Sequence, residues 1–253
     1  MPENLNTLEQ GDIFFFYQPK VQQKNPDSEA DIRRFYMVLI PDQKQKYRLM
    51  VIGQKELPEP NKAGQQRYWG YVLMISETPE QIRNELGSKH YSTKTRGERF
   101  IQTARPSGEG VYRIVNHNGH THLIYSLELP KKNGEVHDEL NIEQQASYII
   151  TVKNPQVESP VRVGLSQNRN ANYPQYLQNK FGDKRFSELD PVDFLDYEGS
   201  EFILISSSED IKEELGIELK TDDESMYSAD IFSKLKLDRS NRPSSPLFKG
   251  EWK

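Results

Sequence analysis

The chain has 253 residues, a formal net charge of −5 and no cysteine. This length allows a sizeable core in one large or two small domains, and the lack of cysteine excludes disulfides, thiol nucleophiles and cysteine-ligated metal sites. The combination of 13 Tyr, 11 Phe, 15 Gly and 15 Pro favours many short strands joined by turns over long helices.

The N-terminal stretch, MPENLNTLEQGD, lacks the basic and then apolar pattern of a signal peptide. No apolar run in the sequence approaches the roughly 18 residues that a membrane-spanning helix needs. We therefore expect a soluble, cytoplasmic protein that has no membrane partner.

Charge is unevenly distributed along the chain. Residues 188–230 contain 15 acidic residues and 2 lysines, whereas residues 231–253 contain 6 basic and 2 acidic residues. Residues 1–187 contain 25 basic and 21 acidic side chains. An acidic chain therefore consists of a mildly basic body, an acidic segment and a basic C-terminal segment.

Four strand-like runs and one helix are predicted in the first part of the chain. The strand-like runs are residues 13–17, 34–40, 47–53 and 68–76. Because the first run, IFFFY, is apolar or aromatic at every position, we expect a strand that is buried on both faces. Thr78 as N-cap, Pro79 at the first helical position and Gly87 after the last turn predict a short helix between them.

A hairpin is the clearest element in the middle of the chain. Asn118-Gly119 is the preferred pair for a two-residue type I′ turn, and it joins β-rich runs within residues 110–129. A further strand is expected at residues 146–154, and a short helix is expected at residues 174–182.

The chain contains two similar strand–helix units. Residues 201–216, EFILISSSEDIKEELG, repeat the order of strand, cap and Glu-Leu-Gly ending found in residues 71–87. The repeat indicates either two related halves or a common way to end a helix.

We predict a β-rich α+β fold of twisted antiparallel sheets or barrel-like lobes with several short helices. The second predicted lobe is related to the first if the repeated unit marks a duplication. The expected domains are a strand-rich lobe at residues 1–90, a second strand-rich lobe at residues 91–216, and an acidic then basic flexible tail at residues 217–253.

The usual nucleotide-binding, zinc-protease and serine-hydrolase motifs are absent from the sequence. One compact group of residues remains as a candidate for chemistry. The motif HNGHTH contains His117, His120 and His122. A two-residue turn places His117 opposite His120, with His122 and Arg113 on the same face. Three histidines can hold a zinc ion, contact an anion or simply face solvent. Histidines that bind a metal usually donate a hydrogen bond to a carboxylate, and the sequence places none beside them.

A basic stretch, TKTRGERFIQTARPSGEG, occupies residues 93–110 and is predicted to be a loop. Arginine side chains offer planar pairs of donors that suit phosphate or carboxylate groups. Aromatic residues occur among these charges, and such rings can stack on nucleic-acid bases. The alternative is a solvated loop that pairs with the acidic segment at residues 188–230.

The leading interpretation is a soluble binding module for a phosphorylated ligand or a single-stranded nucleic acid. The expected ligand-binding residues are Lys94, Arg96, Arg99, Arg105, Arg113, His117, His120 and His122. One alternative is an enzyme for a small anionic substrate, with a histidine as general base or a metal held by all three. Another is a protein–protein interaction protein that docks through its tail, SSPLFKGEWK. The sequence names no cofactor, ligand or oligomeric state.

Overall fold

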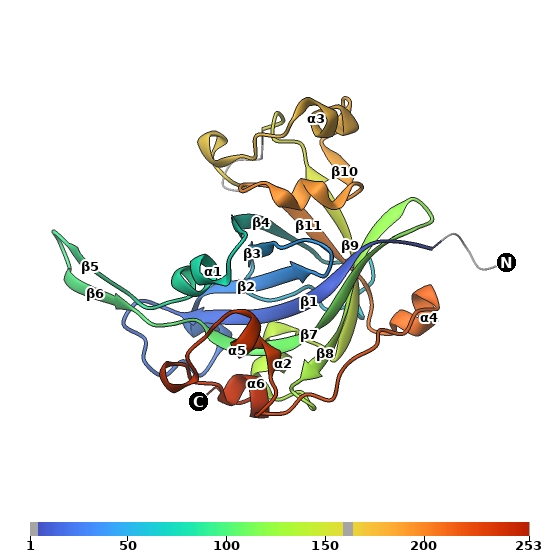
Figure 1. The fold of residues 1–253 in the computed structure, drawn as a ribbon. Coiled ribbons are helices and arrows are strands. Elements are labelled where there is room, and N and C mark those ends of the chain that lie inside the picture. Colours follow the sequence, from blue (N-terminus) through green and yellow to red (C-terminus); the bar gives the residue numbers. More distant parts are fainter. Residues whose placement is uncertain (1–4, 159–163, 253) are drawn as a thin grey trace.

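The computed structural model describes residues 5–158 and 164–252 of the chain (Figure 1). Most of its regular structure consists of antiparallel strands. The strands are β1 (Asn6–Pro19), β2 (Ile32–Pro41), β3 (Tyr47–Ile52), β4 (Arg67–Ser76), β5 (Lys89–Thr93), β6 (Gly97–Ile101), β7 (Arg105–His117), β8 (His120–Leu129), β9 (Gln145–Lys153), β10 (Phe186–Glu188) and β11 (Glu201–Ser208).

The helices within the described residues are short. The α-helices are α1 (Pro79–Glu85), α2 (Glu135–Leu140), α3 (Gln175–Phe181), α4 (Ile211–Leu215), α5 (Asp230–Lys234) and α6 (Ser245–Lys249). The 3-10 helices are η1 (Glu29–Asp31), η2 (Gln167–Arg169), η3 (Val192–Asp196) and η4 (Arg239–Asn241). Helices α1 and α3 confirm the two helices expected after Thr78 and within residues 174–182. In the described part of the chain, no helix has the length and apolar character needed to cross a membrane.

Eight of the strands form a closed antiparallel barrel, which confirms the predicted β-rich α+β class. Their order around the barrel is β9-β11-β4-β3-β2-β1-β7-β8, and β8 pairs with β9 to complete the circle. Strand β10 extends one edge of β9. Strands β5 and β6 pair only with each other in a separate two-stranded sheet.

Strand β1 shows why the sheet closes on itself. Side chains alternate between the two faces of a strand, so Ile13, Phe15 and Tyr17 point into the barrel core. Phe14 and Phe16 point outward into a second core under α1 and the C-terminal segment. The prediction of a strand buried on both faces is confirmed, because all five side chains are fully buried.

Aromatic side chains fill the interior of the barrel. The rings of Phe15 and Tyr125 meet edge to face with centroids 5.2 Å apart, and those of Tyr17 and Trp252 meet in the same way at 5.1 Å. Such contacts stabilise a core beyond the burial of area alone. The barrel is therefore a packed core at these positions.

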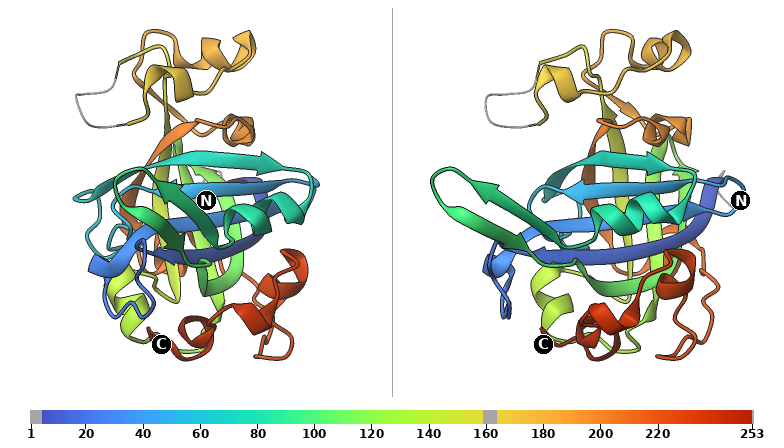
Figure 2. Two further views of the ribbon diagram at one scale, coloured as in Figure 1. Left: turned by 90° about the vertical axis from the view of Figure 1, so that its left-hand side faces the viewer. Right: turned by 60° about the vertical axis from the view of Figure 1, so that its left-hand side comes forward.

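The segment after residue 217, predicted as a flexible tail, packs against one side of the barrel (Figure 2). It forms α5, η4 and α6 and buries Ile231, Leu235, Leu247 and Trp252. The isolated apolar residues of this stretch were too sparse to reveal a core-facing pattern. They are buried because they join the two cores formed with barrel strands far away along the chain, and the local sequence does not show those contacts.

The predicted lobes at residues 1–90 and 91–216 contribute strands to the same sheet. Strand β1 of the first range pairs with β7 of the second, and β4 of the first pairs with β11 of the second. Long-range pairing of this kind is invisible to local periodicity, which predicts the strands but not their neighbours. The two similar strand–helix units thus begin with adjacent antiparallel strands, β4 and β11.

Candidate functional site

The expected ligand-binding residues fall in separate places. Lys94, Arg96 and Arg99 belong to the hairpin formed by β5, its turn and β6. His117 and His120 flank the turn between β7 and β8. The β5–β6 hairpin projects from one side of the barrel, and the β7–β8 turn lies on the other side (Figure 1). The structure therefore does not bring the arginines of the hairpin beside the histidines.

Two further arginines of the expected set, Arg105 and Arg113, lie on β7. Arg105 is buried, and its guanidinium donates 2.8 Å hydrogen bonds to the backbone carbonyls of Trp252 and Lys24. Arg113 lines a small cavity that also includes Asp12 and Asp42. Arg105 therefore lies in the core and not, as predicted, in an exposed basic loop. Its hydrogen bond to Trp252 joins β7 to the C-terminal segment.

The histidine motif forms the predicted hairpin, with His117 opposite His120. His122 is buried, with Nδ1 3.1 Å from the hydroxyl of Ser147 and 3.7 Å from a carboxylate oxygen of Glu214. Burial lowers the pKa of His122, and the nearby Glu214 does not offset this effect. The neutral imidazole is therefore favoured near neutral pH.

This histidine group does not form the alternative metal centre held by all three histidines. Nδ1 of His122 faces Ser147 and Glu214. Within residues 5–158 and 164–252, no group of three or more His, Asp or Glu side chains is arranged to hold a metal ion. His120 instead lies 3.4 Å from Glu188.

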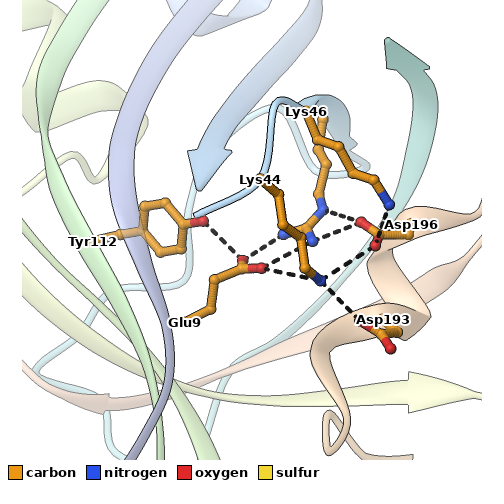
Figure 3. Close-up of polar contacts among 7 residues, drawn as sticks. Glu9, Lys44, Lys46, Tyr112, Asp193 and Asp196 are labelled. Carbon is orange, nitrogen blue, oxygen red and sulfur yellow. Dashed lines mark hydrogen bonds and ion pairs between the residues drawn. The ribbon is translucent and has the colours of Figure 1, made fainter. Parts of the chain in front are cut away.

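A buried charge network at one end of the barrel was not found from the sequence (Figure 3). Arg48 on β3 is fully buried, and it donates hydrogen bonds to Glu9 on β1 and to Asp196 on η3. The distances are 3.0 Å from Nη2 to Glu9 and 2.6 Å from Nη2 to Asp196. Lys46 and Lys44 add ion pairs to Asp196 and Asp193 at 2.6 and 2.8 Å. The one signal in the sequence is an arginine within the otherwise apolar run YRLMVI.

The network is electrically compensated. Burial opposes the charge on Arg48, but Glu9 and Asp196 outweigh it and raise the arginine's pKa. Burial also raises the pKa of Asp196, but Arg48 and Lys46 outweigh it and bring that pKa below its usual value. Three cations therefore meet three carboxylates, and the group joins η3 to the barrel. An adjoining cavity of about 490 Å³ is bordered by Lys44, whose charge is already neutralised.

The β5–β6 hairpin presents charge differently. Residues 93–110 were predicted as a loop, but residues 97–101 form β6 and Arg105 begins β7. The turn is local: the N–H of Arg96 bonds to Oγ1 of Thr93, and Gly97 has a φ of +63°. Within the described residues, no carboxylate forms an ion pair with Lys94 or Arg96. The tip of the hairpin thus exposes two uncompensated cations.

The two faces of the hairpin carry different aromatic groups. Tyr91 is 39% exposed and lies directly opposite Arg99, whose guanidinium also bonds to Gln22. On the other face, the rings of His90 and Phe100 pack with centroids 4.5 Å apart. Alternation along a strand separates these pairs. The face with Tyr91 and Arg99 therefore has an exposed ring beside a guanidinium. The face with His90 and Phe100 continues to the base of the hairpin.

The acidic segment does not cover this basic hairpin. The backbone N–H groups of Asp230 and Ile231 instead donate 2.7 and 2.9 Å hydrogen bonds to the buried carboxylate of Glu109. The N–H of Asp222 donates a 2.6 Å bond to Glu128 in the same way. Barrel carboxylates thus bind the backbone of this part of the acidic segment, whereas other carboxylates of the segment, such as Asp196, pair with the Arg48 network and not with the hairpin.

The fold and these features define a closed, aromatic-filled β-barrel that carries an external basic hairpin. No protein-family model, curated protein or solved structure matches the chain. A fold supports many functions, and the placement of individual side chains decides among them.

Proposed function

We propose that the protein binds nucleic acid through the β5–β6 hairpin. The observation that carries this proposal is the pair of exposed cations, Lys94 and Arg96, at the tip of a hairpin outside the barrel. Like charges held close together repel one another, and a bound anion would offset the repulsion between these two cations. Arg99 and Tyr91 extend the same surface along the strands.

The chemistry of the hairpin suits a phosphate backbone with accessible bases. Lysine and arginine release bound counterions when they neutralise phosphates, which makes binding strong at low salt and weak at high salt. An exposed ring such as Tyr91 can stack on a base of any sequence. A two-stranded ribbon is also narrow enough to enter a groove of duplex DNA. The hairpin therefore favours binding with little sequence preference.

The two alternative functions have less support. For an enzyme built on the histidine motif, His122 is buried and the described residues hold no metal centre, although His120 is exposed beside Glu188. An interaction protein that docks through its C-terminal tail needs exposed apolar residues, but Leu247 and Trp252 are buried in the chain's own core.

The proposal is tested with the full chain and a fluorescein-labelled single-stranded oligonucleotide of about 20 nucleotides, by polarisation at several salt concentrations. The test variant is Lys94→Gln/Arg96→Gln. We expect its affinity to fall about tenfold or more at low salt, and the dependence of log K on log[salt] to flatten by about 1 to 2.

A matched control is Lys180→Gln/Lys184→Gln, which removes two exposed positive charges around the end of α3, away from the hairpin. This control should bind as the wild type does. An equal loss of affinity in both variants indicates a nonspecific effect of net charge, and no loss in the hairpin variant contradicts the proposal. Truncation after residue 187 is not a usable test, because it removes the barrel strand β11.

A further inference from the structure

A polar groove lies at the base of the basic hairpin and is separate from the tip. Its cavity has a volume of about 890 Å³. One wall is the C-terminal end of α1 with Arg83 and Asn84, another is the β6–β7 connection with Gln102, and the third is the segment around η4 with Arg242. Phe100 belongs to both the hairpin and the groove, so the two surfaces are continuous.

The groove contains an arginine without a carboxylate partner. The guanidinium of Arg242 is buried and donates to the carbonyls of Ala104 at 2.8 Å, Leu86 at 3.2 Å and Arg83 at 3.5 Å. These carbonyls partly satisfy its donors and fix its plane, but they do not neutralise its charge. Within the described residues, no ion pair joins a carboxylate to Arg242 or to Arg83.

The local field of the groove is positive. Among the described residues that line it, Asp238 alone carries a carboxylate, and its oxygens accept hydrogen bonds from Ser240 and Asn241. Burial, together with the neighbouring Arg83, lowers the pKa of Arg242 to about 10, although Asp238 opposes the fall. Two guanidinium groups therefore share the groove with one carboxylate, and a bound anion relieves their repulsion.

The remaining lining suits bases as well as phosphates. Asn84 and Gln102 carry amides, which both donate and accept hydrogen bonds as the edges of bases do. The ring of Phe100 provides a surface for stacking. Sites of about 300 to 1,000 Å³ accommodate small-molecule ligands, so this cavity suits one or two nucleotides of a single strand better than a double helix.

We propose that this groove binds a single-stranded nucleic-acid segment, with phosphate beside Arg83 and Arg242 and a base stacked on Phe100. The inference rests on the proposed function and names its partner: the hairpin attracts the backbone of any nucleic acid, and the groove selects the single strand. The C-terminal segment then has a functional role, because it supplies Arg242 and one wall of the site.

The test compares a labelled single-stranded oligonucleotide with its duplex on full-length variants, by fluorescence polarisation. Arg83→Gln is the groove variant, since Arg83 is half-exposed, and Arg185→Gln on the exposed chain before β10 is the control with the same charge change. We expect Arg83→Gln to weaken single-strand binding about fivefold and to leave duplex binding unchanged. Lys94→Gln/Arg96→Gln should weaken both, and Arg185→Gln should weaken neither.

The outcomes separate the two proposals. If Lys94→Gln/Arg96→Gln weakens binding but Arg83→Gln acts equally on both forms or on neither, the groove is not the single-strand site and the hairpin proposal stands. If the wild-type protein binds neither oligonucleotide, both proposals fail, and tight binding of a phosphoserine peptide instead assigns the groove to a protein partner. Ultraviolet crosslinking of a 5-bromouracil oligonucleotide, mapped by mass spectrometry, gives a readout without mutation, and the crosslink should fall on Phe100 or its neighbours.

Discussion

The Arg48 network and the tip of the β5–β6 hairpin both gather cations, but they use them in opposite ways. In the network, Arg48, Lys44 and Lys46 all lie within 3 Å of a carboxylate. In the hairpin, Lys94 and Arg96 have no such partner in the described part of the chain. The two groups of cations differ in their pairing with carboxylates and in their burial.

This difference separates charges that hold the fold from charges that are available to a partner. A buried cation is tolerated only when it is paired and hydrogen-bonded, because removing it from water is costly. An exposed cation has no such requirement, and a surface ion pair contributes little to stability. We therefore expect substitutions in the two regions to act on different measurements.

The largest effect on stability is expected for Arg48→Met. The substitution leaves the carboxylates of Glu9 and Asp196 buried without their central partner, which should lower the free energy of unfolding by about 3 to 5 kcal/mol. Urea titration followed by circular dichroism measures this loss. Lys46→Gln, at the partly exposed rim of the same network, should cost less than about 1 kcal/mol. Equal losses in the two variants contradict the assignment of Arg48 as the centre of the network.

The second largest effect is expected for Trp252→Ala, which tests whether the C-terminal tail belongs to the core. Trp252 is 3% exposed and packs against Tyr17. Its removal should cost about 3 kcal/mol or more, because a buried tryptophan leaves a cavity when it is truncated. Tyr227→Ala is the control, since Tyr227 is 88% exposed. Unchanged stability in Trp252→Ala indicates instead that the tail is free to dock elsewhere.

A smaller, pH-dependent effect is expected at Glu109. Burial raises its pKa from 4.5 to about 7, although the N–H groups of Ile231 and Asp230 oppose the rise. A carboxyl whose folded pKa is raised stabilises the fold fully below pH 4.5, and that contribution is lost as the pH rises through 7. Between pH 4.5 and pH 8, wild-type protein should therefore lose roughly 2 to 3 kcal/mol relative to Glu109→Gln. Urea titrations of both proteins at several pH values measure the difference, and parallel curves for the two proteins contradict the prediction.

The smallest effect on stability is expected for Lys94→Gln/Arg96→Gln, the variant with the largest expected effect on binding. Because these side chains are exposed and pair with no carboxylate in the described residues, the free energy of unfolding should change by less than about 0.5 kcal/mol. Urea titration of the protein used for the binding assay measures it. A loss above about 1 kcal/mol means that the hairpin charges stabilise the fold, and the contrast with Arg48 then disappears.

Several elements could be predicted because their causes are local. Asn118 and Gly119 adopt φ values of 52° and 82°, as the expected type I′ turn requires. Pro79 begins α1, and the continuous apolar run from Ile13 to Tyr17 forms a strand buried on both faces. Each of these outcomes depends on backbone preferences or on side-chain alternation within a few residues.

The candidate site could be predicted only in part, for a related reason. Lys94, Arg96 and Arg99 stay together because one hairpin carries them. Arg105 is only six positions beyond Arg99 along the chain, yet it is buried and hydrogen-bonded to Trp252. The groove was missed altogether, because its walls come from α1, the β6–β7 connection and η4. Residues that are close in the sequence are close in space only when they belong to the same strand, helix or hairpin.

The sequence by itself determined the β-rich class, the turn at Asn118-Gly119 and several of the barrel strands, since these follow from side-chain periodicity and backbone preference. Tertiary structure alone decided which charges are compensated. Arg48 is neutralised by Asp196, which is 148 residues away along the chain, and Lys94 is not neutralised by the acidic segment that the sequence offered. Coulomb attraction depends on distance in space and on burial, and both are set only when the strands close into the barrel.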